Sequence, residues 1–138
     1  NTLNNEMYFF AFHTTDGIGL YKDNGNAGAQ LIKTIHPNAY YNGVYGSIVV
    51  GNKMYFIAED PSYGFELWVS DGTSAGTNMV RDIYVGGYSS FPSPPVAMGN
   101  SVYFMADDGN SGFELWKSDG TYLGTSMVKY IDQGPGSS

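Results

Sequence analysis

A sequence repeat with an offset of 48 residues constrains this chain more than any other feature. Residues 64–73 read GFELWVSDGT, and residues 112–121 read GFELWKSDGT. The match continues upstream, where GNKMYFIAED (51–60) aligns with GNSVYFMADD (99–108), and downstream, where GTNMVRDI (76–83) aligns with GTSMVKYI (124–131). Self-similarity at a fixed period of this length is typical of folds built from repeated supersecondary units.

A weaker third copy precedes these two. NNEMYFFAFH (4–13) aligns with residues 51–60 at an offset of 47, and one residue is missing after Asn26. The repeat divides the 138 residues into units at 1–47, 48–95 and 96–138, the first of them divergent. Because the chain begins with Asn1 and holds almost three whole units, we expect a processed product or a fragment of a longer array.

Each unit is predicted to contain four short strands. In the third unit we expect strands at Val96–Met98, Ser101–Asp107, Phe113–Ser118 and Ser126–Ile131, separated by Gly-rich turns. A four-stranded antiparallel unit with a period of about 40–50 residues is typical of a β-propeller blade. We therefore predict an all-β, propeller-type repeat of three blades, with a β-sandwich as the alternative.

Three blades are too few to close a propeller, which needs about four or more. Open terminal blades would expose apolar faces and strand edges that soluble chains cover. Two explanations are open: further repeats of the same polypeptide, or association of several copies. Both predict that the chain does not remain a lone monomer.

Charge and composition exclude several classes of function. A net charge of −7 and a pI near 4.4 argue against a nucleic-acid partner. No apolar run is long enough to insert into a membrane as a helix. The absence of Cys excludes disulfide scaffolds, thiol nucleophiles and thiolate metal sites.

The segments GFELWVSDGTSAGTNMVRDI (64–83) and GFELWKSDGTYLGTSMVKYI (112–131) resemble the bacterial ELWxxDGT repeat family, and GGYSS (86–90) resembles its linker. The first unit departs from the pattern, because Gly19-Leu20-Tyr21 replaces Glu-Leu-Trp. The resemblance implies large secreted or surface-attached bacterial proteins with propeller-like repeats. It implies no enzymatic activity.

Two buried-looking carboxylates recur, Glu66 and Glu114, each flanked by Phe and Leu. An unpaired carboxylate in such a strand costs several kcal/mol. The two alternatives are a ligand or metal site repeated in each unit and a hydrogen-bonded structural strut, and we favour the strut. The first unit lacks the Glu and also the threonines that follow it, Thr73 and Thr77. These joint losses predict one cluster, in which the Glu accepts hydrogen bonds from Thr hydroxyls or nearby backbone N–H groups.

The Asp-Gly-Thr segments are interpreted as turns, of the kind that closes two-residue hairpins, because Gly tolerates positive φ and Asp hydrogen-bonds its own backbone. The alternative is calcium, for which Asp60, Asp107 and Asp108 are the candidates. The repeat motif of the second and third units is therefore predicted to be structural. Its residues are Glu66, Trp68, Asp71, Gly72 and Thr73 in the second unit and Glu114, Trp116, Asp119, Gly120 and Thr121 in the third.

Aromatic residues fall into two groups. Trp68, Trp116 and Tyr21 share one repeat position, and we expect them to be wedges between blades, as we do Tyr8, Tyr55 and Tyr103. Aromatics in the connections are expected either to pack against a neighbouring blade or chain or to stack on sugar rings. These candidates are Tyr40, Tyr41, Tyr84, Tyr88 and Tyr122.

Catalysis has little support, since His13 and His36 do not recur and no nucleophile or metal motif is present. We therefore expect no enzyme and no obligatory cofactor. The predicted function is a non-catalytic structural and assembly module, extracellular or on a bacterial cell surface. The alternative is a carbohydrate-binding propeller of the lectin or adhesin kind, with calcium as a candidate stabilising ion.

Overall fold

The described part of the chain, residues 1–39 and 43–129, folds into three four-stranded antiparallel sheets in this computed structural model. The all-β prediction is confirmed, and the helical structure in the described residues is a single short 3-10 segment, η1 (Gly25–Ala27). The sheets follow one another along the chain, and their strands neighbour one another in sequence order. Each sheet is therefore a local unit that the chain completes before starting the next.

The strands of the three sheets have these bounds. The first sheet contains β1 (Thr2–Leu3), β2 (Glu6–His13), β3 (Gly17–Asp23) and β4 (Ala29–His36). The second contains β5 (Val44–Val50), β6 (Lys53–Asp60), β7 (Gly64–Ser70) and β8 (Asn78–Met79). The third contains β9 (Val96–Met98), β10 (Ser101–Asp107), β11 (Phe113–Ser118) and β12 (Ser126–Lys129).

The strands predicted for the third unit agree with β9, β10 and β11, while the end of the fourth predicted strand lies outside the described residues. One prediction was wrong. The Asp-Gly segment does not close a two-residue hairpin, because residues 71–77 all lie between β7 and β8. The unit boundary at 47/48 falls inside β5, which begins at Val44.

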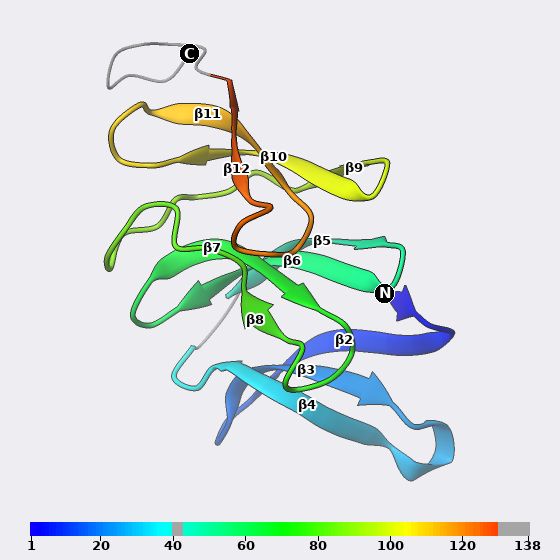
Figure 1. Cartoon of the computed structure of the whole chain (residues 1–138). Helices are drawn as coiled ribbons and strands as arrows, with labels where there is room; N and C mark the ends of the chain where they lie inside the picture. Colours follow the sequence, from blue (N-terminus) through cyan, green and yellow to red (C-terminus); the bar gives the residue numbers. More distant parts are fainter. Residues whose placement is uncertain (40–42, 130–138) are drawn as a thin grey trace.

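Figure 1 shows the three sheets stacked as layers, with the first at the bottom and the third at the top. The described residues form no closed ring and their sheets are not arranged as a propeller, so the predicted propeller-type arrangement is not confirmed. Three sheets replace the two of a simple sandwich. Two apolar clusters fill the spaces between layers. One contains Leu3, Tyr8, Leu20, Ile35, Met54, Phe56, Ala58 and Trp68, and the other contains Tyr55, Leu67, Val69, Val80, Ile83, Val102, Phe104, Ala106 and Trp116.

Strand alternation assigns the residues of each sheet to two faces. We call the face that carries Tyr8, Tyr55 or Tyr103 the Tyr face, and the face that carries Tyr21, Trp68 or Trp116 the Trp face. Because Tyr8 and Trp68 share one cluster and Tyr55 and Trp116 share the other, each Tyr face packs against the Trp face of the next sheet.

The middle sheet shows why its strands read as continuous apolar runs. Tyr55, Phe56, Ile57 and Ala58 are all buried in β6, although alternate residues point to opposite faces. Both faces of this sheet are covered, so no position in the run faces water.

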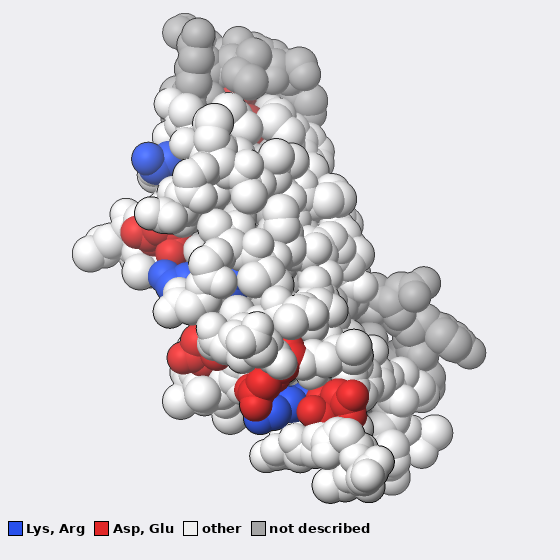
Figure 2. Space-filling view, turned by 90° about the vertical axis from the view of Figure 1, so that its right-hand side faces the viewer, with Lys and Arg blue, Asp and Glu red and all other residues white. Residues whose placement is uncertain are grey.

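The surface carries few charges. In the view of Figure 2 the charged groups gather along the left side and the lower part of the stack, and the rest of the described face is mostly uncharged. No helix among the described residues has the length and apolarity needed to cross a membrane.

Candidate functional site

The strongest repeated feature is the connection between the third and fourth strands of the last two units, which we call the SDGT turn (residues 70–77 and 118–125). In the second unit the Asp71 carboxylate accepts hydrogen bonds from the Thr73 amide at 2.9 Å and the Thr73 hydroxyl at 2.7 Å. The Thr77 hydroxyl donates to the Thr73 carbonyl at 2.6 Å and contacts the Ser70 hydroxyl at 2.7 Å. The turn is thus closed by its own side chains.

The third unit repeats this network almost atom for atom. Asp119 accepts from the Thr121 amide at 2.9 Å and from the Thr121 hydroxyl at 2.6 Å, and the Ser118 and Thr125 hydroxyls lie 2.7 Å apart. Hydrogen bonds from Thr73 and Thr121 lower the pKa of Asp71 and Asp119, because they stabilise the charged carboxylate. The interpretation of both segments as turns with Asp side chains bonded to their own backbone is confirmed.

The candidate calcium ligands also bond to neighbouring amides. The Asp60 carboxylate accepts from the Ser62 amide at 2.7 Å, and Asp107 accepts from the Gly109 amide at 2.8 Å. Asp108 accepts from the amides of the two residues Asn110 and Ser111, at 2.9 and 2.7 Å. Among the residues that the structure describes, no three or more His, Cys, Asp or Glu side chains form a group that could hold a metal ion.

Glu66 is a buried carboxyl that joins β7 to the linker between the second and third sheets. Its oxygens accept hydrogen bonds from the Ser90 hydroxyl at 2.5 Å, the Ser90 amide at 3.2 Å and the Ile83 amide at 3.4 Å. Burial raises the pKa of Glu66 to about 7, although these hydrogen bonds oppose the shift. The side chain therefore acts as a strut between segments 24 residues apart in the chain.

The predicted hydrogen bonds from backbone N–H groups to Glu66 are confirmed, since the Ile83 and Ser90 amides donate to it, but the predicted contact with the threonines was wrong. Thr73 bonds to Asp71, and Thr77 bonds to Ser70 and to the Thr73 carbonyl. The partner of Glu66 is instead Ser90, which lies in the linker. The Glu66 contact and the SDGT turn are two separate clusters, and the first unit has neither the Glu nor the two threonines.

Glu114 lies at the equivalent position of β11, opposite Ala106 as Glu66 lies opposite Ala58, and it is equally buried. Ser138 aligns with Ser90 at the repeat offset and lies outside the described residues.

Trp68 and Trp116 are both buried, one in each of the two clusters between sheets. Neither indole N–H has a hydrogen-bond partner within the described ranges. Both side chains therefore contribute packing, as expected of wedges. Tyr21, at the same repeat position, is half-buried and stacks on Phe9 with ring centroids 5.8 Å apart.

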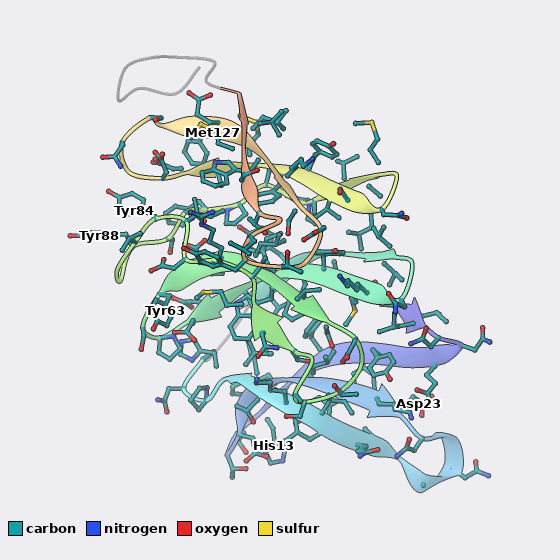
Figure 3. All side chains as sticks on the ribbon, viewed as in Figure 1. His13, Asp23, Tyr63, Tyr84, Tyr88 and Met127 are labelled. Carbon is teal, nitrogen blue, oxygen red and sulfur yellow. The ribbon has the colours of Figure 1, made fainter. Side chains whose placement is uncertain are left out.

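The loop aromatics have different surroundings. Tyr40 and Tyr41 lie outside the described residues. The rings of Tyr84 and Tyr88 contact each other at 5.0 Å, and Figure 3 places both on the same side of the stack as Tyr63. Tyr122 instead lies under the Arg81 guanidinium, 4.7 Å from the ring centroid. Tyr122 is thus a contact between units, whereas Tyr88 is exposed and its partner Tyr84 is half-buried against Gly109 of the third unit.

Sequence reasoning missed the basic residues that connect neighbouring units. The Lys33 ammonium donates to the Thr77 carbonyl at 2.7 Å, and the Arg81 guanidinium donates to the Thr125 carbonyl at 2.8 Å. The two cations are 48 residues apart. Their shared position in a chain with only six Lys and Arg residues was the available signal.

Three aromatic rings form a row in which Phe91 of the linker packs on the second sheet. Phe65 lies between Tyr45 and Phe91, with ring centroids 5.7 and 6.2 Å away. The Tyr45 hydroxyl donates to the Pro92 carbonyl at 2.8 Å, and Phe91 has a φ of 46°, which is uncommon for a bulky residue. These contacts clamp the linker onto the second sheet.

Together these groups form a scaffold of turns, struts and wedges that holds sheet against sheet. Comparisons with protein-family models, with curated proteins and with solved structures found no match for this chain. The resemblance to the ELWxxDGT repeats remains a prediction from the motif.

Proposed function

We propose that this chain is a non-catalytic, extracellular structural module that assembles with further units of its own kind. The observation that carries the proposal is the state of the two outermost sheet faces. Each has the composition of a face that is covered elsewhere in the molecule. In this proposal the sheets are blade-like units, and additional units extend the row of three.

The Trp face of the first sheet is apolar and uncovered. Met7 is 55% exposed and Leu31 40% exposed, while Met54, the equivalent of Met7, is fully buried in the second sheet. On the Tyr face of the third sheet, Val128 is 46% exposed, whereas its equivalent Val80 is 6% exposed. Exposed apolar surface of this kind marks an interaction site.

Among the described residues neither outer face packs against another sheet, and the two are complementary, because a Tyr face packs on a Trp face in both internal interfaces. Contact between the third sheet of one copy and the first sheet of another would be head-to-tail. Such interfaces produce open chains when the rotation does not close a ring. A secreted assembly protein of low charge fits this behaviour.

Sedimentation velocity from about 1 to 100 µM tests the proposal, since this range covers micromolar dissociation constants. We expect the parent chain to associate and Leu31→Asp to remain monomeric, because the new charge lies on the Trp face. Leu123→Asp is the matched control, since Leu123 is 92% exposed in a turn away from both faces. A parent that stays monomeric throughout, or two variants that behave alike, would contradict self-association.

Carbohydrate binding is the second candidate, supported by the Tyr84–Tyr88 pair. Tyr88 is 66% exposed, and flat exposed rings stack well on sugars. Retention on a glycan array that is lost in Tyr88→Ala and kept in Tyr122→Ala would favour it. Calcium stabilisation belongs to the same candidate, and we expect it to raise the melting temperature if it occurs.

A further inference from the structure

Polar contacts between neighbouring sheets converge on one element, the SDGT turn of the following unit. Lys33 of the first unit reaches the Thr77 carbonyl, and Arg81 of the second unit reaches the Thr125 carbonyl, at 2.7 and 2.8 Å. Lys53 also donates to the Asp119 carbonyl at 2.8 Å. Each preceding unit thus supplies cations, and each following unit supplies an acidic turn that accepts them.

The turn glycine is the point of closest approach. Gly72 and Gly120 have φ values of +93° and +92°, which favour glycine. A Cβ atom at Gly72 would lie 2.5 Å from the Tyr8 hydroxyl, and one at Gly120 would lie 3.0 Å from the Tyr55 hydroxyl. The glycine therefore leaves room for the tyrosine of the preceding Tyr face.

The sequence of the third sheet repeats the tyrosine and one of the two cation positions of this arrangement, while Ser101 stands at the position of Lys53. Tyr103 occupies in β10 the position that Tyr8 and Tyr55 occupy in β2 and β6, and Lys129 lies in β12 at the repeat position of Lys33 and Arg81. Tyr8 and Tyr55 are buried by the following unit, whereas Tyr103 is half-buried. Its face continues the pattern of two interfaces that already exist in the molecule.

The first unit lacks the acceptor half. Asp23-Asn24-Gly25-Asn26 stands where the later units have Ser-Asp-Gly-Thr, and the connection is one residue shorter. Its ends still meet as in the SDGT turn, because the Asn24 amide bonds to the Gly28 carbonyl at 2.8 Å as the Asp71 amide bonds to the Gly76 carbonyl at 3.3 Å. A Cβ atom at Gly25 would meet nothing within 4 Å, so no tyrosine lies against it.

We infer that the Tyr face of the third sheet is a docking surface for a repeat unit that carries an SDGT turn, with the turn glycine placed on Tyr103. The inference rests on the proposed assembly function and names its preferred partner. The first sheet of a second copy offers the apolar half of the interface without the turn. A turn-bearing unit offers both halves and binds more tightly.

A graft tests this directly. Replacing residues 23–29 of the first unit with residues 70–77 would give the first sheet an SDGT turn. The first sheet of one copy could then place this turn on the third sheet of another copy. We expect the dissociation constant of self-association to fall by about tenfold or more, since hydrogen bonds from cations to the SDGT turn join both internal interfaces and a single hydrogen bond to a charged group contributes about that factor or more. Sedimentation velocity measures it, and circular dichroism checks that the strands are retained.

Tyr103→Ala, made in both the parent and the grafted chain, is the control. We expect it to remove the gain from the graft while changing the parent less. A folded graft that associates no more tightly than the parent would overturn the inference and leave the proposed function standing. If the graft does not fold, Asn24→Asp with Asn26→Thr restores Asp-Gly-Thr without changing the length. Tighter self-association of this double variant would support docking of the SDGT turn on the third sheet, and unchanged association would overturn it.

Discussion

The first and second units build the same sheet but connect it to the next one with different chemistry. In the second unit the buried Glu66 and Ser90 form a polar strut. In the first unit Gly19 aligns with Glu66, and Gly43 takes the backbone place of Ser90, because its carbonyl accepts from the Glu59 amide as the Ser90 carbonyl accepts from the Asp107 amide. The first unit therefore has neither member of the Glu66–Ser90 pair at the corresponding places.

Apolar side chains fill the vacated space. A Cβ atom at Gly43 would lie 3.0 Å from the Ile18 side chain, and one at Gly19 would lie 2.7 Å from the Leu31 side chain. Ile18 and Ala39 are buried there. A lone buried carboxylate would be costly, so we expect the Glu and the Ser to occur together or to be absent together. Two solutions to one connection show that the sheet stack, and not the strut, is the common requirement.

The largest expected difference between the units concerns the wedge position. Trp68→Ala should lower the free energy of unfolding by about 3–5 kcal/mol, because it leaves a large cavity between two sheets. Tyr21→Ala should cost about 1 kcal/mol, since Tyr21 lies on an uncovered face. Urea denaturation at a protein concentration that keeps the chain monomeric measures both. Equal losses would mean that Tyr21 is covered in the monomer.

The strut should show an intermediate effect. Glu66→Ala leaves the Ser90 and Ile83 amides without their acceptor, and we expect a loss of about 1–3 kcal/mol at pH 5. In a double-mutant cycle with Ser90→Ala, the combined loss should be smaller than the sum of the two single losses. Additive losses would show that the two residues do not act as a pair.

The smallest expected effect, counted as the change in the free energy of unfolding per pH unit, is a pH dependence that comes from Glu66 in the second unit. Folding raises the pKa of Glu66 from its ordinary value of 4.5 to about 7, so the folded state favours the protonated acid. The stability that this group provides is complete below about pH 4.5 and is lost as the pH rises to about 7, by at most about 1.4 kcal/mol per pH unit. Chemical denaturation across this window measures the slope, and Glu66→Gln should flatten it. An unchanged slope in that variant would assign the dependence to another group.

Much of this architecture follows from local sequence patterns. The SDGT turn could be predicted because its hydrogen bonds join residues within eight positions of each other, and Asp, Gly and Thr have strong local preferences. Strand positions followed from short aromatic and β-branched runs between glycines. The Glu66–Ser90 contact could not be predicted in this way, because the linker places Ser90 only after the second sheet has formed.

The 48-residue period, the four strands of each unit and the turn chemistry are thus written in the chain itself, because short-range hydrogen bonding and alternation decide them. The pairing of each Tyr face with the next Trp face emerged from the folded stack. So did the cations that reach the next turn, the two glycines of the first unit and the two faces left uncovered. These features depend on how whole sheets pack against one another. Contacts between sheets join residues that are far apart in the sequence, so they leave no pattern within a single strand.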